Sequence, residues 1–221
     1  MKRKWITVLA TLLVPAALLA QQSGNTSEKS RQSGDMTSRA AKVGDMSRTE
    51  FERVNREGAA KVASFKPSSG NLSAQDRELM MQVATGGMKQ LTLSQVAARK
   101  AERADIRELA LAEVEEQSGL AAKLKEMAAA KGMELPSEPD EQTTQMLQRF
   151  EGLSGDQVSQ FYLSESGVKG HEELEKTMTE VQAKAQDNDL KRLAATALPL
   201  VRTHLKVARA MIPNSVTGNK K

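Results

Sequence analysis

The sequence predicts an all-α protein, a ferritin-like four-helix bundle of two antiparallel hairpins joined by a long crossover that contains a short helix. Three observations support this class. From residue 71 onward apolar residues recur at helical intervals, and no alternating strand pattern extends beyond a few residues. The first and second long segments are joined by a short link, as are the third and fourth, whereas the middle link is long. The chain has no cysteine, so packing must hold it together.

The N-terminus predicts export. Lys2, Arg3 and Lys4 precede an uncharged apolar run over residues 6–20, the pattern of a secretory signal peptide at 1–20. Such a run rises only about 22 Å as a helix, less than the roughly 30 Å hydrocarbon core, which favours a cleaved signal over a membrane span. Leu18 is larger than the residue usual near a cleavage site. We therefore expect a periplasmic protein, with inner-membrane anchoring through an uncleaved signal segment as the alternative.

A tether follows the signal. Residues 21–70 are rich in serine, glycine and charged residues and poor in aliphatic ones, which predicts a flexible, mostly disordered segment. One candidate short helix lies at 47–65, because Ser47 and Glu50 have the spacing of a capping box and apolar residues follow at helical intervals. The bundle domain is expected over residues 71–212, with a disordered tail at 213–221.

The first hairpin is predicted from two long apolar patterns. The first helix begins after Ser73, a suitable N-cap, and extends to about residue 101. It contains Gly86-Gly87, and each glycine costs about 1 kcal/mol relative to alanine in a helix. We expect either a break or the close approach of another backbone there. The second helix begins near Asp105 and ends at Lys131-Gly132, a basic last turn followed by a capping glycine.

The crossover and second hairpin follow. The link contains Pro136 and Pro139 and a short helix predicted at 141–150. The third long helix begins around residues 154–156 and continues through Val181. The last begins at residues 187–189, includes Pro199, and ends near Met211 before Pro213.

Polar residues inside the apolar stripes predict a buried layer. The chain has only two histidines, and both lie among aliphatic residues at helical spacing. A turn centred near residue 103 places Gln90 level with Glu113, Glu116 and Gln117, of which Glu113 and Gln117 face inward with Gln90. A turn near residue 186 brings the two imidazoles to one height. If the hairpins are in register, one buried polar layer halfway along the bundle contains Gln90, Glu113, Gln117, His171 and His204.

This layer allows two interpretations. Two imidazoles and a carboxylate suit zinc or iron, so His171, His204 and Glu113 are the candidate metal ligands. The ferritin-like di-iron set needs a Glu-x-x-His motif on each of two helices, and it is absent because Val168 and Val201 precede the histidines by three residues. The other interpretation is a structural network of hydrogen-bonded side chains with no cofactor. We identify no catalytic residue, and cysteine nucleophiles are excluded.

Charge argues against a nucleic-acid partner. The net charge is +4, but residues 1–20 carry three of the positive charges, and residues 71–221 carry a net −2. The chain has no basic face and few aromatic residues, so no nucleic acid is expected. The partners that suit an exported helical protein are other envelope proteins or the membrane surface.

Several short motifs, in their order along the chain, resemble an exported bacterial family known as domain of unknown function 4142. They are Asp76, Gly86-Gly87-Met88 with residues 93–97, Lys131-Gly132 before Leu135-Pro136, Tyr162-Leu163 with His171, and Leu198-Pro199-Leu200 with His204. The resemblance covers residues 72–211 and implies a ferritin-like bundle.

This chain departs from the pattern at three positions. The glutamate usual in the family's first helix aligns with Gln90, and its Asp-His pair aligns with Glu116-Gln117. If the family binds metal at this layer, two candidate ligands have become amides here, and Glu113, at a typically apolar position, could compensate. The sequence therefore favours a non-enzymatic envelope or interaction protein, with a metal-binding ferritin-like protein as the alternative.

Overall fold

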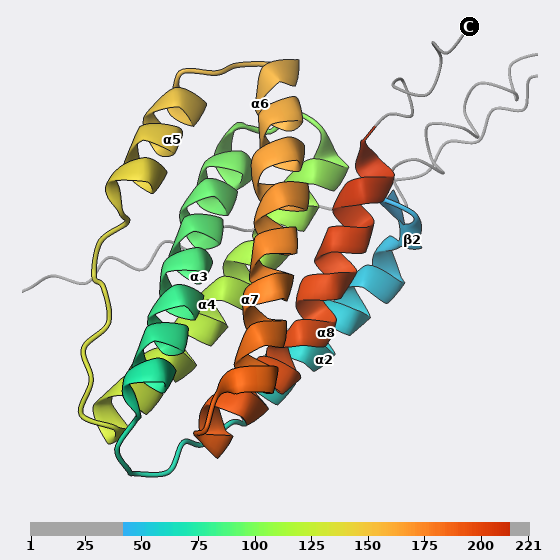
Figure 1. Cartoon of the computed structure of the whole chain (residues 1–221). Coiled ribbons are helices and arrows are strands. Elements are labelled where there is room, and N and C mark those ends of the chain that lie inside the picture. The colour runs from blue at the N-terminus through green and yellow to red at the C-terminus, as the bar shows by residue number, and fades with distance from the viewer. Residues whose placement is uncertain (1–41, 213–221) are drawn as a thin grey trace, which may run out of the picture.

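Two helical hairpins form the bundle in the computed structural model, which describes residues 42–212 (Figure 1). α3 (Ala74–Lys100) and α4 (Ala104–Ala130) make the first hairpin, and α7 (His171–Lys184) and α8 (Asn188–Met211) make the second. All four follow the long axis of the bundle. The predicted all-α class and ferritin-like arrangement are confirmed.

The crossover between the hairpins contains the predicted short helix, α5 (Glu141–Glu151). After it, α6 (Asp156–Phe161) and the π-helix η1 (Tyr162–Gly170) lead without interruption into α7. The sequence predicts one helix over this rod, and the structure adds the π-helical stretch within it. A π-helix closes its hydrogen bonds five residues apart, so it changes which side chains and carbonyls lie above one another.

The helix starts follow from their capping residues. Ser73 accepts a hydrogen bond from the Asp76 backbone N–H at 3.1 Å, as expected for the start of α3. Asp187 caps α8 in the same way by accepting from the backbone N–H of Leu190 at 2.9 Å. α3 continues through Gly86-Gly87 without a break.

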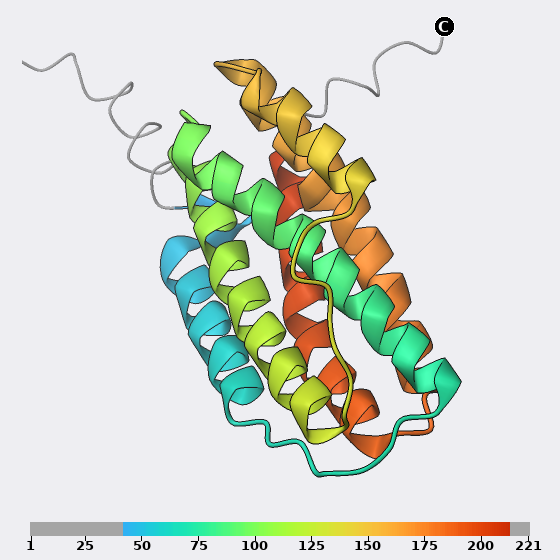
Figure 2. The same ribbon diagram turned by 90° about the vertical axis from the view of Figure 1, so that its left-hand side faces the viewer.

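Over residues 42–70 the structure contains the candidate helix expected at 47–65, with Ser47 as its N-cap, but packs it against the bundle where a mostly disordered tether is expected. A two-residue hairpin, β1 (Lys42–Val43) and β2 (Met46–Ser47), leads into a full helix, α2 (Arg48–Ala63). α2 packs along α4 and α8 on one side of the bundle (Figures 1 and 2). Phe51, Asn55 and Val62 share one face of α2 and are buried, which is why this polar segment can pack.

The remaining predictions for the chain ends lie outside the described residues. These are the signal peptide at 1–20, the tether over 21–41 and the tail at 213–221. Within residues 42–212, no helix combines the length and the apolar character needed to span a membrane.

The apolar core is divided into two clusters, one towards each end of the bundle. One contains Leu79 and Val83 of α3 with Leu120 and Leu124 of α4. The other contains residues nearer the α3–α4 turn, such as Leu93 and Ile106. α8 and the α6–η1–α7 rod contribute to both clusters. Along each of these helices, the residues between the two clusters include buried polar ones, so a polar layer separates two hydrophobic cores.

The packing of α2 predicts how truncating Phe51, in its first turn, changes the stability of the protein. Phe51 is 1% exposed and lies among the second cluster. Phe51→Ala should lower the free energy of unfolding by about 3–5 kcal/mol, because it removes a buried ring and leaves a cavity. Urea denaturation measures this change. The exposed neighbour Glu52→Ala is the control and should change stability by only a few tenths of a kcal/mol; equal effects of the two substitutions would show that α2 does not pack in solution.

Candidate metal centre

All five residues of the expected polar layer are buried. Glu113, His171 and His204 come from α4, the start of α7 and α8, and each offers one ligand atom within 4.8 Å of the others. The two imidazole rings meet edge to face, with centroids 5.8 Å apart. The structure thus brings together the three residues that the sequence analysis selected as candidate ligands.

His171 is positioned by the π-helix. Its Nδ1 lies 3.0 Å from the backbone carbonyl oxygen of Ser166, five residues earlier, which is the spacing that π-helical turns stack. Gln90 Nε2, which only donates, also lies 3.0 Å from this nitrogen, so the two contacts fit opposite tautomers. In the tautomer with the proton on Nδ1, that nitrogen donates to the carbonyl oxygen. Nε2 is then left with its lone pair, and it faces Glu113 Oε1 at 3.5 Å.

Gln90 supports the same carbonyl. Its Nε2 donates to the Ser166 carbonyl oxygen at 3.0 Å, and its Oε1 accepts from the Ser166 hydroxyl at 2.9 Å. The amide can approach only because residue 170 is glycine: a Cβ there would lie 2.4 Å from Gln90 Oε1. Gln90 therefore fixes the π-helix and uses both ends of its amide within the protein.

His204 is positioned by α2. Its Nε2 lies 2.6 Å from Asn55 Oδ1. The Asn55 amide is oriented by its own Nδ2, which donates to the Phe51 carbonyl oxygen at 2.8 Å, so the oxygen is the atom that faces the histidine. Because an amide oxygen only accepts, His204 Nε2 carries a proton and donates it. The other ring nitrogen, Nδ1, points into the polar layer.

Glu116 is the charged neighbour of that nitrogen. Its Oε2 lies 2.6 Å from His204 Nδ1, although neither atom has a well-aligned hydrogen bond, so the contact is mainly one of charge. Burial lowers the pKa of His204, but the carboxylate of Glu116, with a smaller contribution from Glu113, outweighs it, and the pKa is raised above its usual value. The His204 imidazolium is thus stabilised by an adjacent buried carboxylate.

Glu113 is held at one oxygen and free at the other. Its Oε2 accepts from the Ser94 hydroxyl at 2.7 Å, and Ser94 Oγ lies 3.3 Å from the Tyr162 hydroxyl. Burial, reinforced by Glu113, raises the pKa of Tyr162 well above its usual value, so the phenol stays protonated and donates to Ser94. The Oε1 atom of Glu113 has no hydrogen-bond partner.

Gln117 is buried but makes no hydrogen bond to the other four residues of the layer. Both of its amide atoms lack a partner. Its Oε1 rests against α3 at Gly87, where a Cβ would lie 3.1 Å away. Of the two expectations for Gly86-Gly87, close approach therefore describes the structure better than a break, although the group that approaches is a side-chain amide rather than a backbone.

Unpartnered buried polar atoms are concentrated in this layer. Within residues 42–212, eight buried side-chain nitrogen or oxygen atoms lack a hydrogen-bond partner, and seven of them belong to Glu113, Glu116, Gln117, His171 and His204. Such atoms are costly in a protein interior, at about 1–3 kcal/mol each, and their clustering marks a site where something else completes the bonding.

Sequence reasoning missed five residues that shape the site. Ser94 lies on α3, and Tyr162 and Ser166 lie on η1. Asn55 lies on α2, the candidate helix of the segment expected to be a tether. Glu116 was placed level with the layer but not among its inward residues. The missing signal is α2, because the face of α4 that carries Glu116 is buried only when α2 covers it.

Comparison with known proteins identifies the family. The model of the family described as Domain of unknown function (DUF4142) matches residues 62–211, and the chain belongs to this family. The match includes every residue of the polar layer but excludes most of α2, with Phe51 and Asn55. The family assignment made from the sequence motifs is confirmed.

A structural relative supports the fold. The chain is similar to a DUF305 fragment from Deinococcus radiodurans, with a TM-score of 0.55 and 14% sequence identity over 63% of this chain and 96% of that one. At this identity the likeness concerns the helical fold alone. No curated protein matches the sequence.

The raised pKa of His204 predicts how stability depends on pH. The proton is bound more tightly in the folded than in the unfolded protein, so this contribution is complete below the unfolded value of 6.5 and is lost as pH rises through the folded pKa. With a chelator present, the urea midpoint should therefore fall over this range. Glu116→Gln removes the main stabilising charge and should flatten the profile; an unchanged slope in this variant would contradict the assignment.

Proposed function

We propose that this chain is an exported metal-binding protein whose polar layer holds one divalent transition metal, zinc or iron, between Glu113, His171 and His204. The sequence analysis ranked this interpretation second, behind a non-enzymatic envelope or interaction protein. The arrangement of the buried atoms favours it over a purely structural network.

One observation carries the proposal. Glu113 Oε1, His171 Nε2 and His204 Nδ1 have no aligned hydrogen bond, and the opposite atom of each side chain is held by another residue. Of the three atoms, His204 Nδ1 also has a charged neighbour, Glu116 Oε2 at 2.6 Å. Ser94, the Ser166 carbonyl and Asn55 hold those opposite atoms. Metal-binding histidines commonly donate their second ring N–H to such an acceptor, which fixes the tautomer and aims the lone pair.

The spacing of the three atoms is compatible with a metal ion after a small contraction. Ligands about 2.0–2.1 Å from a tetrahedral zinc ion lie roughly 3.3 Å from one another. His171 Nε2 and Glu113 Oε1 are 3.5 Å apart, and one ligand atom of each of the three residues lies within 4.8 Å of the other two. Small rotations of the three side chains would bring their ligand atoms to this spacing.

Charge in the layer also favours a divalent cation. When Glu113 and Glu116 are ionised, they place two negative charges in a fully buried environment. Lys131, which is also buried, forms ion pairs with Asp187 and Asp189 and does not compensate them. A divalent ion bound to neutral imidazoles would balance both carboxylates, whereas an imidazolium at His204 balances only one.

The donor set narrows the choice of metal. Two imidazole nitrogens and one carboxylate oxygen suit zinc and iron(II). Calcium and magnesium require more oxygen ligands than this set provides. Because a histidine must be deprotonated to bind a metal, the Glu116–His204 contact competes with the ion. Metal affinity should therefore rise with pH.

Export and partners complete the proposal. The basic residues and apolar run at 1–20 support export to the periplasm, with retention of an uncleaved anchor as the alternative. Other envelope proteins, or the membrane surface, are the partners that suit this location.

Elemental analysis tests the proposed function. Protein purified without affinity metals should contain about one equivalent of zinc, iron or manganese, or take up one equivalent of added zinc or iron(II). His171→Ala and His204→Ala should each abolish this stoichiometric binding. Glu180→Gln, at a half-exposed acid on α7 that pairs with Lys184 away from the layer, is the matched control and should retain it. If folded wild-type protein takes up none of these metals, the proposal is wrong and the polar layer is a structural hydrogen-bonded network.

The role of Asn55 gives a second prediction. Asn55→Leu leaves the His204 Nε2 proton without an acceptor and permits the other tautomer, so the metal dissociation constant should rise about 10- to 100-fold. Asn55→Asp keeps an acceptor oxygen in the same place and should preserve binding. Competition with a chromophoric chelator measures both constants. A wild-type affinity in the leucine variant would mean that α2 does not orient the ligand.

A further inference from the structure

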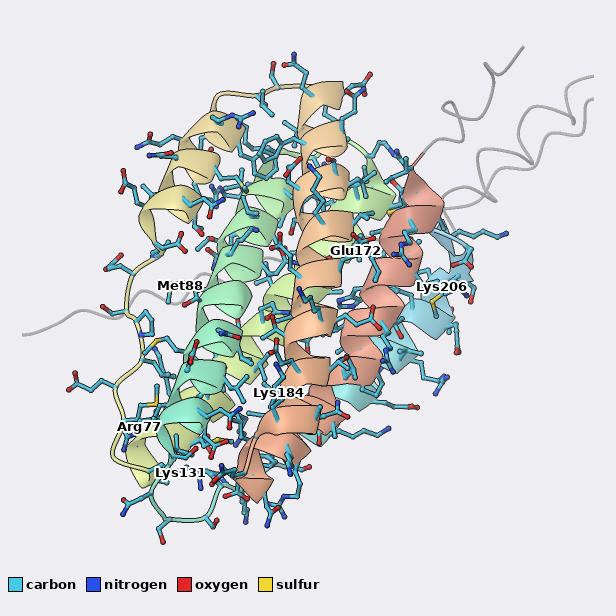
Figure 3. All side chains as sticks on the ribbon, in the orientation of Figure 1. Arg77, Met88, Lys131, Glu172, Lys184 and Lys206 are labelled. Carbon is cyan, nitrogen blue, oxygen red and sulfur yellow. The ribbon has the colours of Figure 1, made fainter. Side chains whose placement is uncertain are left out.

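A groove of about 690 Å³ lies between α3 and α4 beneath the crossover. Figure 2 shows the crossover passing across these two helices before it reaches α5. The walls are mainly aliphatic and include Leu91 of α3 and Leu120, Ala121 and Leu124 of α4. Met88, labelled in Figure 3, also lines it and lies on the side of α3 nearest the crossover. Its volume is typical of a small-molecule site.

The crossover forms a roof that can adjust. Met133 and Leu135 pack against the first core cluster. Between Gly132 and α5, the backbone hydrogen bonds of the described chain occur only at the two ends: Met133 donates to the carbonyl oxygen of Ala128, and the Asp140 carbonyl oxygen accepts from Thr144. Residues 134–139 are therefore held by side-chain packing rather than by a hydrogen-bonded ladder. Such a segment can move outward at low cost and admit an occupant.

Gln117 supplies one polar group to this apolar groove. The residue is 1% exposed, lines the groove, and leaves both amide atoms without a partner. A buried amide in this state needs an acceptor for its N–H and a donor for its carbonyl oxygen. A ligand whose head offers both at once would satisfy the two atoms together.

The charges nearest Gln117 select a neutral head group. Lys125 and Glu134 also line the groove, but Lys125 lies about two helical turns further along α4, beside the body of the ligand rather than its head. Glu113 lies one helical turn before Gln117 on α4, and Glu116 is adjacent in sequence; both are buried. A carboxylate head would meet this negative charge and could accept only from Gln117 Nε2. A primary amide is the better complement, because its carbonyl accepts from Nε2 while its N–H donates to Oε1.

We propose that the groove binds a small linear molecule with a primary amide head against Gln117 and an aliphatic body along Leu91, Leu120 and Leu124. From Gln117 to Ala128 the α4 wall is about 16 Å long, enough for a medium-length alkyl chain. This site is separate from the metal ligands, and the proposal does not depend on metal binding.

Calorimetry with two matched probes tests the head-group selection. The full chain should bind octanamide with a dissociation constant roughly tenfold or more below that of octanoate near neutral pH, because the two probes share an alkyl chain and differ only in the head. No binding of octanamide, or octanoate binding at least as tightly, would overturn the proposal.

Three variants locate the site. Gln117→Met keeps a similar volume without the amide, so the preference for octanamide should fall to about one. Ala121→Trp should fill the groove and abolish binding of both probes. Leu111→Ala, on the exposed side of α4, is the control and should bind as the wild type does. An unchanged preference in the methionine variant would contradict the assigned head site.

Discussion

The structure depends on the burial of two carboxyl groups and two imidazoles at one level between two hydrophobic cores. Removing such groups from water is expensive, so every neighbouring element must offer a partner. The π-helix brings the Ser166 carbonyl to His171, α3 brings Ser94 to Glu113, and α2 brings Asn55 to His204. The features that depart from a simple four-helix bundle are thus the ones that serve this layer.

The hydrogen-bond partners of Glu113, His171 and His204 hold one polar atom of each side chain, so the other atom points into the layer. Each imidazole has one nitrogen held by an oxygen acceptor and the other directed inward, and Glu113 divides its two oxygens in the same way. A network built only for stability would gain most by pairing these groups with one another. Glu116 does pair with His204, but Glu113 Oε1 and His171 Nε2 lie 3.5 Å apart without an aligned hydrogen bond, which is the arrangement on which the proposed metal site rests.

The sequence was sufficient for the bundle and for much of its polar layer, because both follow from helical periodicity and from the lengths of the links. Antiparallel registers alone brought His171, His204 and Glu113 together. The supporting residues depend on tertiary context. Asn55 lies in a polar segment whose helix, α2, packs against α4 and α8 once these two helices are in place. Glu116 is exposed unless α2 covers α4. The π-helix depends on Gly170 meeting the Gln90 amide, which no local propensity indicates.

The two amides of the layer have opposite chemistry, and this explains how the site can work without the carboxylate that the family resemblance would place at position 90. A carboxylate there could not donate to the Ser166 carbonyl, whereas Gln90 donates to that carbonyl and accepts from the Ser166 hydroxyl. Gln90 is therefore fully occupied in holding the turn that orients His171. It also removes one negative charge from a layer that already contains Glu113 and Glu116. Gln117 has neither bond, so its amide remains available to the groove beside it. Amides at these two positions thus separate the proposed three-residue ligand set from the proposed neutral recognition point, one helical turn apart on α4.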